Sequence, residues 1–159
     1  MGIYKNVVTE FIERSLKLVD QYENIKECYN FDEQYNHTLL INCLLGIIVL
    51  PDEKVILHVS NERIEIMKKN CNLKNTTFDD SIRTIRELIR ELRNAVAHFD
   101  IEFESLNESG LIDIIKFKNK EKNIIIATFQ YNELLFFVKY YGKLLIDQLD
   151  NYYKNISNI

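Results

Sequence analysis

The sequence predicts a mainly α-helical protein with a small β-hairpin or meander inserted before its last helix. Apolar residues recur at helical spacing in the first 99 residues and again near the end of the chain. Between residues 101 and 129 the pattern changes to alternation and β-branched runs, in the segments IEFES, LIDIIKFK and NIIIATF. Linker, repeat and low-complexity segments are absent from the sequence, so we expect one domain over residues 1–159.

The first part of the chain predicts two helices and one ambiguous segment. Val7 to Cys28 shows a single apolar stripe at helical spacing. Asp32 is placed to cap a second helix over Glu33 to Leu50, which Pro51 ends because the residue before proline avoids the helical region. Within Lys54 to Lys69, VILHVS suits either a strand or a helical turn, whereas IEIMKK is typical of a helix.

The clearest helical pattern follows, with Thr77 in position to cap it. Its apolar positions advance mainly in steps of three and four: Phe78, Ile82, Ile85, Ile89, Leu92, Val96 and Phe99. After the β segments, whose turns fall at residues 107–110 and 119–123, helical spacing returns from Asn132 to Asn155.

Composition indicates a globular protein, with 47% hydrophobic and 28% charged residues. The net charge of −4 argues against an overall basic footprint for duplex DNA, so nucleic acid would need a local basic patch. Cys28, Cys43 and Cys71 are odd in number and lack C-x-x-C spacing, which favours buried free thiols over a disulfide framework or a zinc site. The first segment places acids among its apolar residues, so we expect no signal peptide, and no run of about 20 apolar residues occurs in the sequence, so we expect a cytoplasmic protein that does not enter the membrane.

The stretch RNAVAHFD, at the end of the helix predicted over residues 78–99, contains the residues that most clearly suggest a functional site. An advance of about 100° per residue places four arginines along one flank of the apolar stripe: Arg83, Arg86, Arg90 and Arg93. A row of like charges is mildly unfavourable unless anions meet it, and Glu87 and Glu91 supply part of that charge. An anionic ligand would supply the remainder.

Arg93 and His98 stand about 140° apart around this helix, with Ala97 and Asn94 between them. A small residue flanked by a guanidinium, an amide and an imidazole leaves space for a phosphate group. The alternative is a helix end without chemistry, because Arg and His cations near a helix C-terminus add about 0.3 to 1 kcal/mol of stability through the helix dipole. Spacing alone does not decide between the two.

RNAVAHFD resembles the signature of the HEPN superfamily, in which an Arg, commonly followed by a polar residue, is separated from a later His by four to six residues. Arg93, Asn94 and His98 match all three positions. NCLLGIIVLPDE, from Asn42 to Glu53, and the hairpin LIDIIKFKNKEKNIIIATF resemble a prokaryotic branch with a β-hairpin before the last helix. The resemblance implies a HEPN-like helical bundle. It also implies a metal-independent endoribonuclease that acts as a homodimer in a toxin-antitoxin or other defence system.

The side chains fit that chemistry without a metal or cofactor. A histidine changes charge close to neutral pH, so His98 can move a proton of the ribose 2′-hydroxyl or of the leaving oxygen. Arg93 is expected to hold the phosphate, Asn94 to orient the phosphate or the imidazole, and Arg86 and Arg90 to bind RNA. Because cleavage commonly uses two proton-transfer groups, a homodimer with a composite Arg/His site is expected.

Expected partners are therefore RNA, single-stranded or tRNA-like, a second copy of the chain, and a cognate antitoxin protein. The alternative function is a catalytically inactive HEPN-type module that binds nucleotide, RNA or protein, as an antitoxin or a sensor. The acidic net charge favours this alternative. Its discriminating property is tight binding without cleavage.

Other polar and aromatic residues are interpreted as structural. His37 is expected to be a helix-terminal or core histidine, and His58 lacks partner ligands at metal spacing. Glu102 and Glu104 alternate with Phe103 and are expected on the solvated face of a strand. The tyrosines of the last helix are assigned to packing rather than to base stacking; they are Tyr140, Tyr141, Tyr152 and Tyr153.

Overall fold

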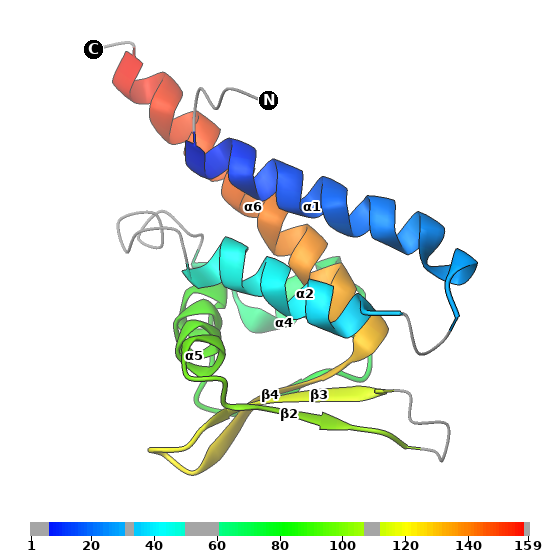
Figure 1. Cartoon of the computed structure of the whole chain (residues 1–159). Coiled ribbons are helices and arrows are strands. Elements are labelled where there is room, and N and C mark those ends of the chain that lie inside the picture. The colour runs from blue at the N-terminus through cyan, green and yellow to red at the C-terminus, as the bar shows by residue number, and fades with distance from the viewer. Residues whose placement is uncertain (1–6, 31–33, 50–60, 107–111, 158–159) are drawn as a thin grey trace.

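The computed structural model describes residues 7–30, 34–49, 61–106 and 112–157 (Figure 1). Within these ranges the chain forms, in order, α1 (Val7–Ile25), the 3-10 helix η1 (Lys26–Cys28), α2 (Asn36–Leu44), the π-helix η3 (Leu45–Val49), α4 (Ile64–Asn70), β1 (Thr77–Phe78), α5 (Ile85–Ala97), β2 (Ile101–Glu104), β3 (Ile114–Asn119), β4 (Ile124–Gln130) and α6 (Tyr131–Ser157). The protein is mainly α-helical with a small antiparallel sheet, as the sequence predicts.

The elements stack from the sheet towards α1, as Figure 1 shows. α5 packs on β3 and β4, η3 packs on α5, and α1 packs on α2 and α6. The start of α1 and the end of α6 lie together at the end of the molecule opposite the sheet. No helix in the described ranges is long and apolar enough to cross a membrane.

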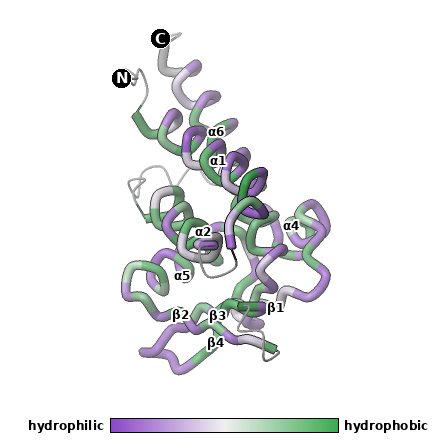
Figure 2. Tube along the Cα trace, turned by 45° about the vertical axis from the view of Figure 1, so that its right-hand side comes forward, coloured by the Kyte–Doolittle hydropathy of each residue, from purple (hydrophilic) through white to green (hydrophobic). Residues whose placement is uncertain are grey.

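Hydrophobic and hydrophilic residues alternate along α1 and α6 (Figure 2), and the two helices pack against each other. Gly142 permits the close approach of the two helices, because a Cβ there would lie 2.9 Å from Leu16 Cδ1. Ile12, Leu16 and Val19 of α1 are buried. The helix predicted from Val7 ends at Ile25, three residues earlier than Cys28, and continues as the 3-10 turn η1.

The second predicted helix is shorter and less regular than its sequence pattern indicates. α2 begins at Asn36, and the chain widens into the π-helix η3 from Leu45. Asp32, the predicted cap, and Leu50, the predicted last residue, lie outside the described residues. Of the ambiguous segment 54–69, residues 54–60 also lie outside them, and the helical reading of IEIMKK is confirmed by α4.

The prediction that Thr77 caps a helix running from Phe78 is wrong. Thr77 and Phe78 form β1, which pairs antiparallel with Thr128 and Ala127 of β4. The helix begins only at Ile85, after a turn in which the Asp79 carboxylate accepts hydrogen bonds from the Ser81 N–H and hydroxyl. Phe78 and Ile82 are spaced as in a helix but pack on the core from a strand and a turn.

The predicted meander is confirmed and gains a fourth strand. The sheet has the order β1-β4-β3-β2, and all neighbours are antiparallel. Near the end of the β3–β4 hairpin the register shifts: Phe117 pairs with Ala127 but Lys118 pairs with Ile125, which leaves Ile126 as an extra residue. Such a bulge bends and twists the strand locally.

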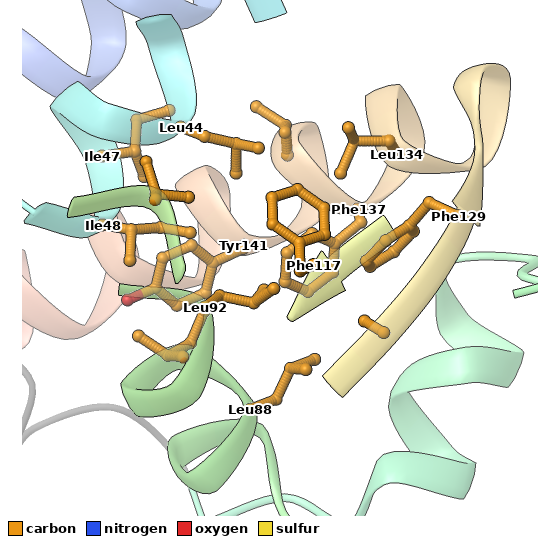
Figure 3. Close-up of a cluster of buried hydrophobic side chains, with 14 of the residues drawn as sticks. Leu44, Ile47, Ile48, Leu88, Leu92, Phe117, Phe129, Leu134, Phe137 and Tyr141 are labelled. Carbon is orange, nitrogen blue, oxygen red and sulfur yellow. The ribbon is translucent and has the colours of Figure 1, made fainter. Parts of the chain in front are cut away.

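The core lies where the helices meet the sheet (Figure 3). Phe117, Phe129 and Phe137 are fully buried, and the Phe129 ring contacts the other two with centroid distances of 5.9 and 5.3 Å. Tyr141 of α6 lies between Ile48 of η3 and Leu92 of α5. A fully buried side chain of this kind contributes about 1.5 to 3 kcal/mol, so this cluster holds α5 firmly between the sheet and η3.

A buried carboxylate joins the start of α6 to the loop before β1. Glu133 is 6% exposed, and its two oxygens accept hydrogen bonds from the backbone N–H groups of Lys74, Asn75 and Thr76 and from the Thr76 hydroxyl. Burial alone would raise the pKa of Glu133, but these hydrogen bonds hold it below its ordinary value. The loop is therefore anchored by an ionised side chain.

Candidate functional site

The helix that carries RNAVAHFD is α5, and a capping box sets its start. Thr84 Oγ1 accepts a hydrogen bond from the Glu87 backbone N–H (3.3 Å), and Glu87 Oε2 accepts one from the Thr84 N–H (3.0 Å). A third bond, from the Arg83 N–H at 2.7 Å, is the main cause of the lowered pKa of Glu87. Because such caps contribute about 1 kcal/mol, the first turn of α5 is well defined.

One face of α5 is buried, and the functional residues lie off it. The buried residues are Ile85, Leu88, Ile89, Leu92, Ala95 and Val96. Arg83 and Arg90 are exposed, whereas Arg86 and Arg93 are half-buried. Nearby Arg90 helps to lower the pKa of both Glu87 and Glu91, so acids of the same helix compensate part of the arginine row.

The helix ends in a Schellman motif that contains a phenylalanine where glycine is usual. His98 is the C-cap residue, the Phe99 N–H donates to the Val96 carbonyl (3.2 Å), and the Asp100 N–H donates to the Ala95 carbonyl (2.7 Å). Phe99 has φ 53°, in the left-handed region that non-glycine residues adopt at a cost. Its side chain is 63% exposed. The residue after His98 is therefore strained and presents an aromatic ring to solvent.

Asn94 and His98 are exposed and line one groove between the end of α5 and the β3–β4 turn. The groove has a volume of about 480 Å³. Its walls are polar, with α5 and the following connection on one side and the hairpin on the other: Asn94, Ala95, His98, Asp100, Lys118, Asn119, Lys120 and Glu121. Two amides, an imidazole, two ammonium groups and two carboxylates thus line one open space.

The hairpin wall is fixed to α5 through Glu91. Glu91 Oε1 pairs with Lys122 Nζ at 2.5 Å, and Glu91 Oε2 accepts a hydrogen bond from Asn119 Nδ2 at 2.9 Å. Burial would raise the pKa of Glu91, but the bonds from Lys122 and Asn119 hold it below its ordinary value. Lys120 forms an ion pair with Asp100 across the groove. The turn is therefore a positioned part of the site.

Arg93 does not share this groove with His98. Among the described residues that line it, Asn94 and His98 are present and Arg93 is not. Arg93 instead lies near Tyr141, where burial raises the tyrosine pKa and the guanidinium charge partly offsets that rise. Within one chain, the structure brings together two of the three predicted catalytic residues and leaves the third on another side of the helix.

The predicted RNA-binding residues Arg86 and Arg90 also lie away from the groove. Neither is among its described lining residues, and both belong to earlier turns of α5. The ammonium groups that line it belong to Lys118 and Lys120, for which the sequence predicts only a strand and a turn. The missed signal is the alternation of lysines in KFKNKEK, which places four of them around one hairpin end.

The predictions for the other two histidines fall on side chains that the structure does not describe. His37 belongs to α2, and its side chain is outside what the structure describes, as is the whole of His58. No group of three or more His, Cys, Asp or Glu side chains with metal-binding geometry occurs in the described part of the chain. Cys43 and Cys71 are buried, which raises their pKa to about 11 and about 12, whereas Cys28 is exposed, contrary to the prediction.

The acidic residues of β2 face lysines of β3. Glu102 is exposed and pairs with Lys118, and Glu104 is half-exposed and pairs with Lys116 at 2.5 Å. The prediction of a solvated strand face is confirmed for these acids. Phe103, which alternates with them, is itself 38% exposed, so β2 is open to solvent on both sides at its centre.

The tyrosines of α6 fall into two groups. Tyr141 is 2% exposed and belongs to the core, and Tyr140 is half-buried with its hydroxyl donating to Glu62 Oε2 at 2.8 Å. Packing is therefore the confirmed role of this pair. Tyr152 and Tyr153 are 39% and 38% exposed and contact each other edge to face, with centroids 5.5 Å apart, so they lie outside the core of the single chain and their packing role stays a prediction.

Comparison with known proteins supports the resemblance carried by RNAVAHFD. The model of the family HEPN pEK499 p136 matches residues 1–152, which includes α5, the hairpin and almost all of α6. Neither the curated proteins nor the solved structures contain a match to the chain. The match extends over nearly the whole length, well beyond the short Arg-to-His motif. The chain therefore belongs to the HEPN pEK499 p136 family.

Proposed function

We propose that the protein is a metal-independent endoribonuclease that cleaves RNA at a composite site in a homodimer. The observation that carries the proposal is the exposure of Asn94 and His98 on one polar groove at the end of α5. Membership of a HEPN family supports it, since this superfamily includes ribonuclease toxins. We further propose that it acts in the cytoplasm, within a toxin-antitoxin or other defence system, with an antitoxin protein as a partner.

The reaction is a transesterification within RNA. The imidazole of His98 takes the proton of the ribose 2′-hydroxyl, and the 2′-oxygen forms a bond to phosphorus. The bond between phosphorus and the 5′-oxygen breaks, and that oxygen takes a proton from a second acid, leaving a 2′,3′-cyclic phosphate and a 5′-hydroxyl. Arg93 stabilises the negative charge on the non-bridging oxygens, and Asn94 orients the phosphate. General acid-base catalysis of this kind contributes about 10² to 10⁴-fold.

The position of Arg93 favours a site built from two chains. Arg93 and His98 point to different surroundings in one chain, and each chain supplies one His98. A two-fold axis near the ends of two α5 helices places a second imidazole close to the first, one as base and one as acid. Arg86 and Arg90 are proposed to contact the phosphates of the approaching RNA strand.

The test is incubation of end-labelled, single-stranded RNA with the purified protein in excess EDTA. We expect cleavage that persists in EDTA, products with cyclic phosphate ends, and loss of at least 10²-fold in rate for His98→Ala. Glu65→Ala, at an exposed position of α4, is the matched control because it should leave the rate unchanged. Cleavage that EDTA abolishes, or that His98→Ala leaves intact, contradicts the proposal.

A second candidate function is a binding module without activity, an antitoxin or sensor. The net charge of −4 favours it, because RNA binding by a protein of this size usually draws on a positive balance. This function predicts no cleavage by the wild type under any tested condition, together with a stable complex. Native mass spectrometry of the complex that co-purifies with the protein from its own cells distinguishes the two.

A further inference from the structure

We propose that the β3–β4 turn carries a phosphate-binding subsite for the RNA strand, and that Lys120 is the residue that contacts the phosphate. The inference rests on the proposed function, since it places a second point of contact beside His98. It adds to the proposed phosphate contacts of Arg86 and Arg90 a further point at which the RNA backbone is held, on the hairpin and beside His98.

The first support is the shape of the surface around the turn. The groove that contains His98 adjoins a second hollow of about 410 Å³ on the hairpin, and the two share Lys118, Asn119 and Lys120. Both volumes fall within the roughly 300 to 1,000 Å³ usual for small-molecule sites, which suits one nucleotide unit each. A strand that occupies both hollows crosses the residues that they share, and its backbone there carries a phosphate.

The second support is the state of the four hairpin lysines. Each forms an ion pair, but the Lys120 side chain is 71% exposed, against 23%, 31% and 57% for Lys116, Lys118 and Lys122. An ammonium group has three N–H donors, and the pair with Asp100 uses one. Lys120 therefore combines a defined position with donors that remain available to a ligand.

The third support is the fixed position of its partner. The Asp100 side chain is only 13% exposed, and its backbone is held at both ends. The Asp100 N–H donates to the Ala95 carbonyl (2.7 Å), and its carbonyl accepts from the Lys118 N–H (2.9 Å). Asp100 thus belongs to the same rigid helix end as His98, and it sets the ammonium of Lys120 at a fixed place in the groove that His98 lines.

The test measures binding without cleavage. Single-stranded RNA with a 2′-O-methyl group on every ribose cannot be cleaved, because the attacking hydroxyl is blocked. We titrate it against wild type and Lys120→Met at salt concentrations from 50 to about 200 mM. Loss of one phosphate contact reduces the slope of log K against log salt by about 0.7 for a single strand, so we expect Lys120→Met to show that reduction and weaker binding at low salt.

Lys116→Met is the matched control. It removes the same charge from the same hairpin, but Lys116 lines neither hollow among the described residues. We expect its salt slope to remain that of the wild type, and circular dichroism melts confirm that both variants fold. Equal slopes for Lys120→Met and wild type overturn the subsite, and so does an equal reduction in both variants, which would show only a general effect of charge.

The outcome is independent of catalysis. If the wild type binds the blocked RNA with the expected Lys120 contribution but never cleaves unmodified RNA, the subsite stands and the proposed nuclease fails. If the wild type cleaves but Lys120→Met binds normally, the nuclease stands and the subsite fails. If Lys120→Met leaves RNA binding intact and instead changes the mass of the assembly in light scattering, the turn is a protein interface and the subsite is overturned.

Discussion

Glu91 of α5 and Lys122 of the β3–β4 turn form an ion pair of 2.5 Å across 31 residues of sequence. The same carboxylate holds Asn119 through its other oxygen, at 2.9 Å. Because the Glu91 side chain is only 17% exposed, this pair is less screened than those on the open surface. It fixes the distance between the helix that carries His98 and the hairpin that carries Lys120, and so defines the width of the groove.

Glu91→Ala is therefore expected to loosen the groove more than it destabilises the fold. We predict a loss of about 1 kcal/mol in the free energy of unfolding, faster hydrogen exchange at residues 118–124, and a decrease of about 10-fold in RNA cleavage. Glu65→Ala, on the exposed side of α4, serves as the control. Unchanged exchange in the hairpin would show that the turn is held without Glu91.

The left-handed conformation of Phe99 predicts an unusual order of stabilities. At φ 53° glycine has no steric penalty, whereas alanine keeps the penalty and lacks the ring. We expect Phe99→Gly to be more stable than Phe99→Ala by about 1 kcal/mol, measured by urea unfolding of both variants. The reverse order would mean that contacts of the ring, rather than the backbone, hold the end of α5.

Replacement of His98 separates chemistry from stability. His98 is exposed, so His98→Ala should change the free energy of unfolding by within about 0.5 kcal/mol while it abolishes cleavage. Val96→Asp should instead lower the free energy of unfolding strongly, because Val96 is 3% exposed and an unpaired charge buried there is costly. Thermal melts alongside the RNA assay check both. A large fall in Tm for His98→Ala would identify a structural histidine.

Glu133 predicts a specific pH dependence of stability. The pKa of Glu133 in the folded chain is lowered from its ordinary value of 4.5. The ionised side chain therefore contributes fully to the free energy of unfolding at a pH above the pKa of the unfolded chain, and this contribution is lost as the pH falls through the pKa of the folded chain. At pH 7 we expect Glu133→Gln to be less stable than the wild type by about 2 kcal/mol. The difference should shrink steadily in urea unfolding below about pH 4.5. A constant difference from pH 7 to pH 3 would contradict the assignment.

A shared site at a two-fold axis predicts how mixed dimers behave. If cleavage needs His98 from both chains, activity in exchanged mixtures of wild type and His98→Ala should fall with the square of the wild-type fraction. Light scattering should give twice the chain mass of 18.9 kDa. A linear decrease would contradict the shared site. Recovery of activity on mixing Arg93→Ala with His98→Ala would instead indicate two separate sites, each with one residue from each chain.

The sequence predicts well those features that follow from local periodicity. Apolar spacing in the sequence predicts the fold class and four of its elements, α1, α5, the hairpin and α6. The residues at these apolar positions are the ones that pack in the core, as the buried residues of α5 show. The start of α5 is different, because Phe78 has helical spacing but lies in a strand. Its partner, Ala127 of β4, is remote in the chain, and a pattern within one segment cannot reveal such a pairing.

The candidate site is predicted only in part, for a similar reason. The exposure of Asn94 and His98 follows from their places on α5, and so does the position of Arg93 away from the buried face. The groove itself depends on Lys118 and Lys120, which come from a hairpin later in the chain and face α5 only through tertiary contacts. Ion pairs between distant segments leave no trace in the local spacing of charges.

The anchoring of the groove by the hairpin also has a consequence for synthesis on the ribosome. His98 leaves the exit tunnel before Lys118 to Lys122, and chains emerge at about 5 to 20 residues per second. A nascent chain that ends soon after α5 carries RNAVAHFD but lacks one wall of the groove, together with β3 and β4, which pack on that helix. Translation must therefore proceed past residues 114–130 before both walls of the groove exist, so the candidate site cannot form while the chain ends at α5.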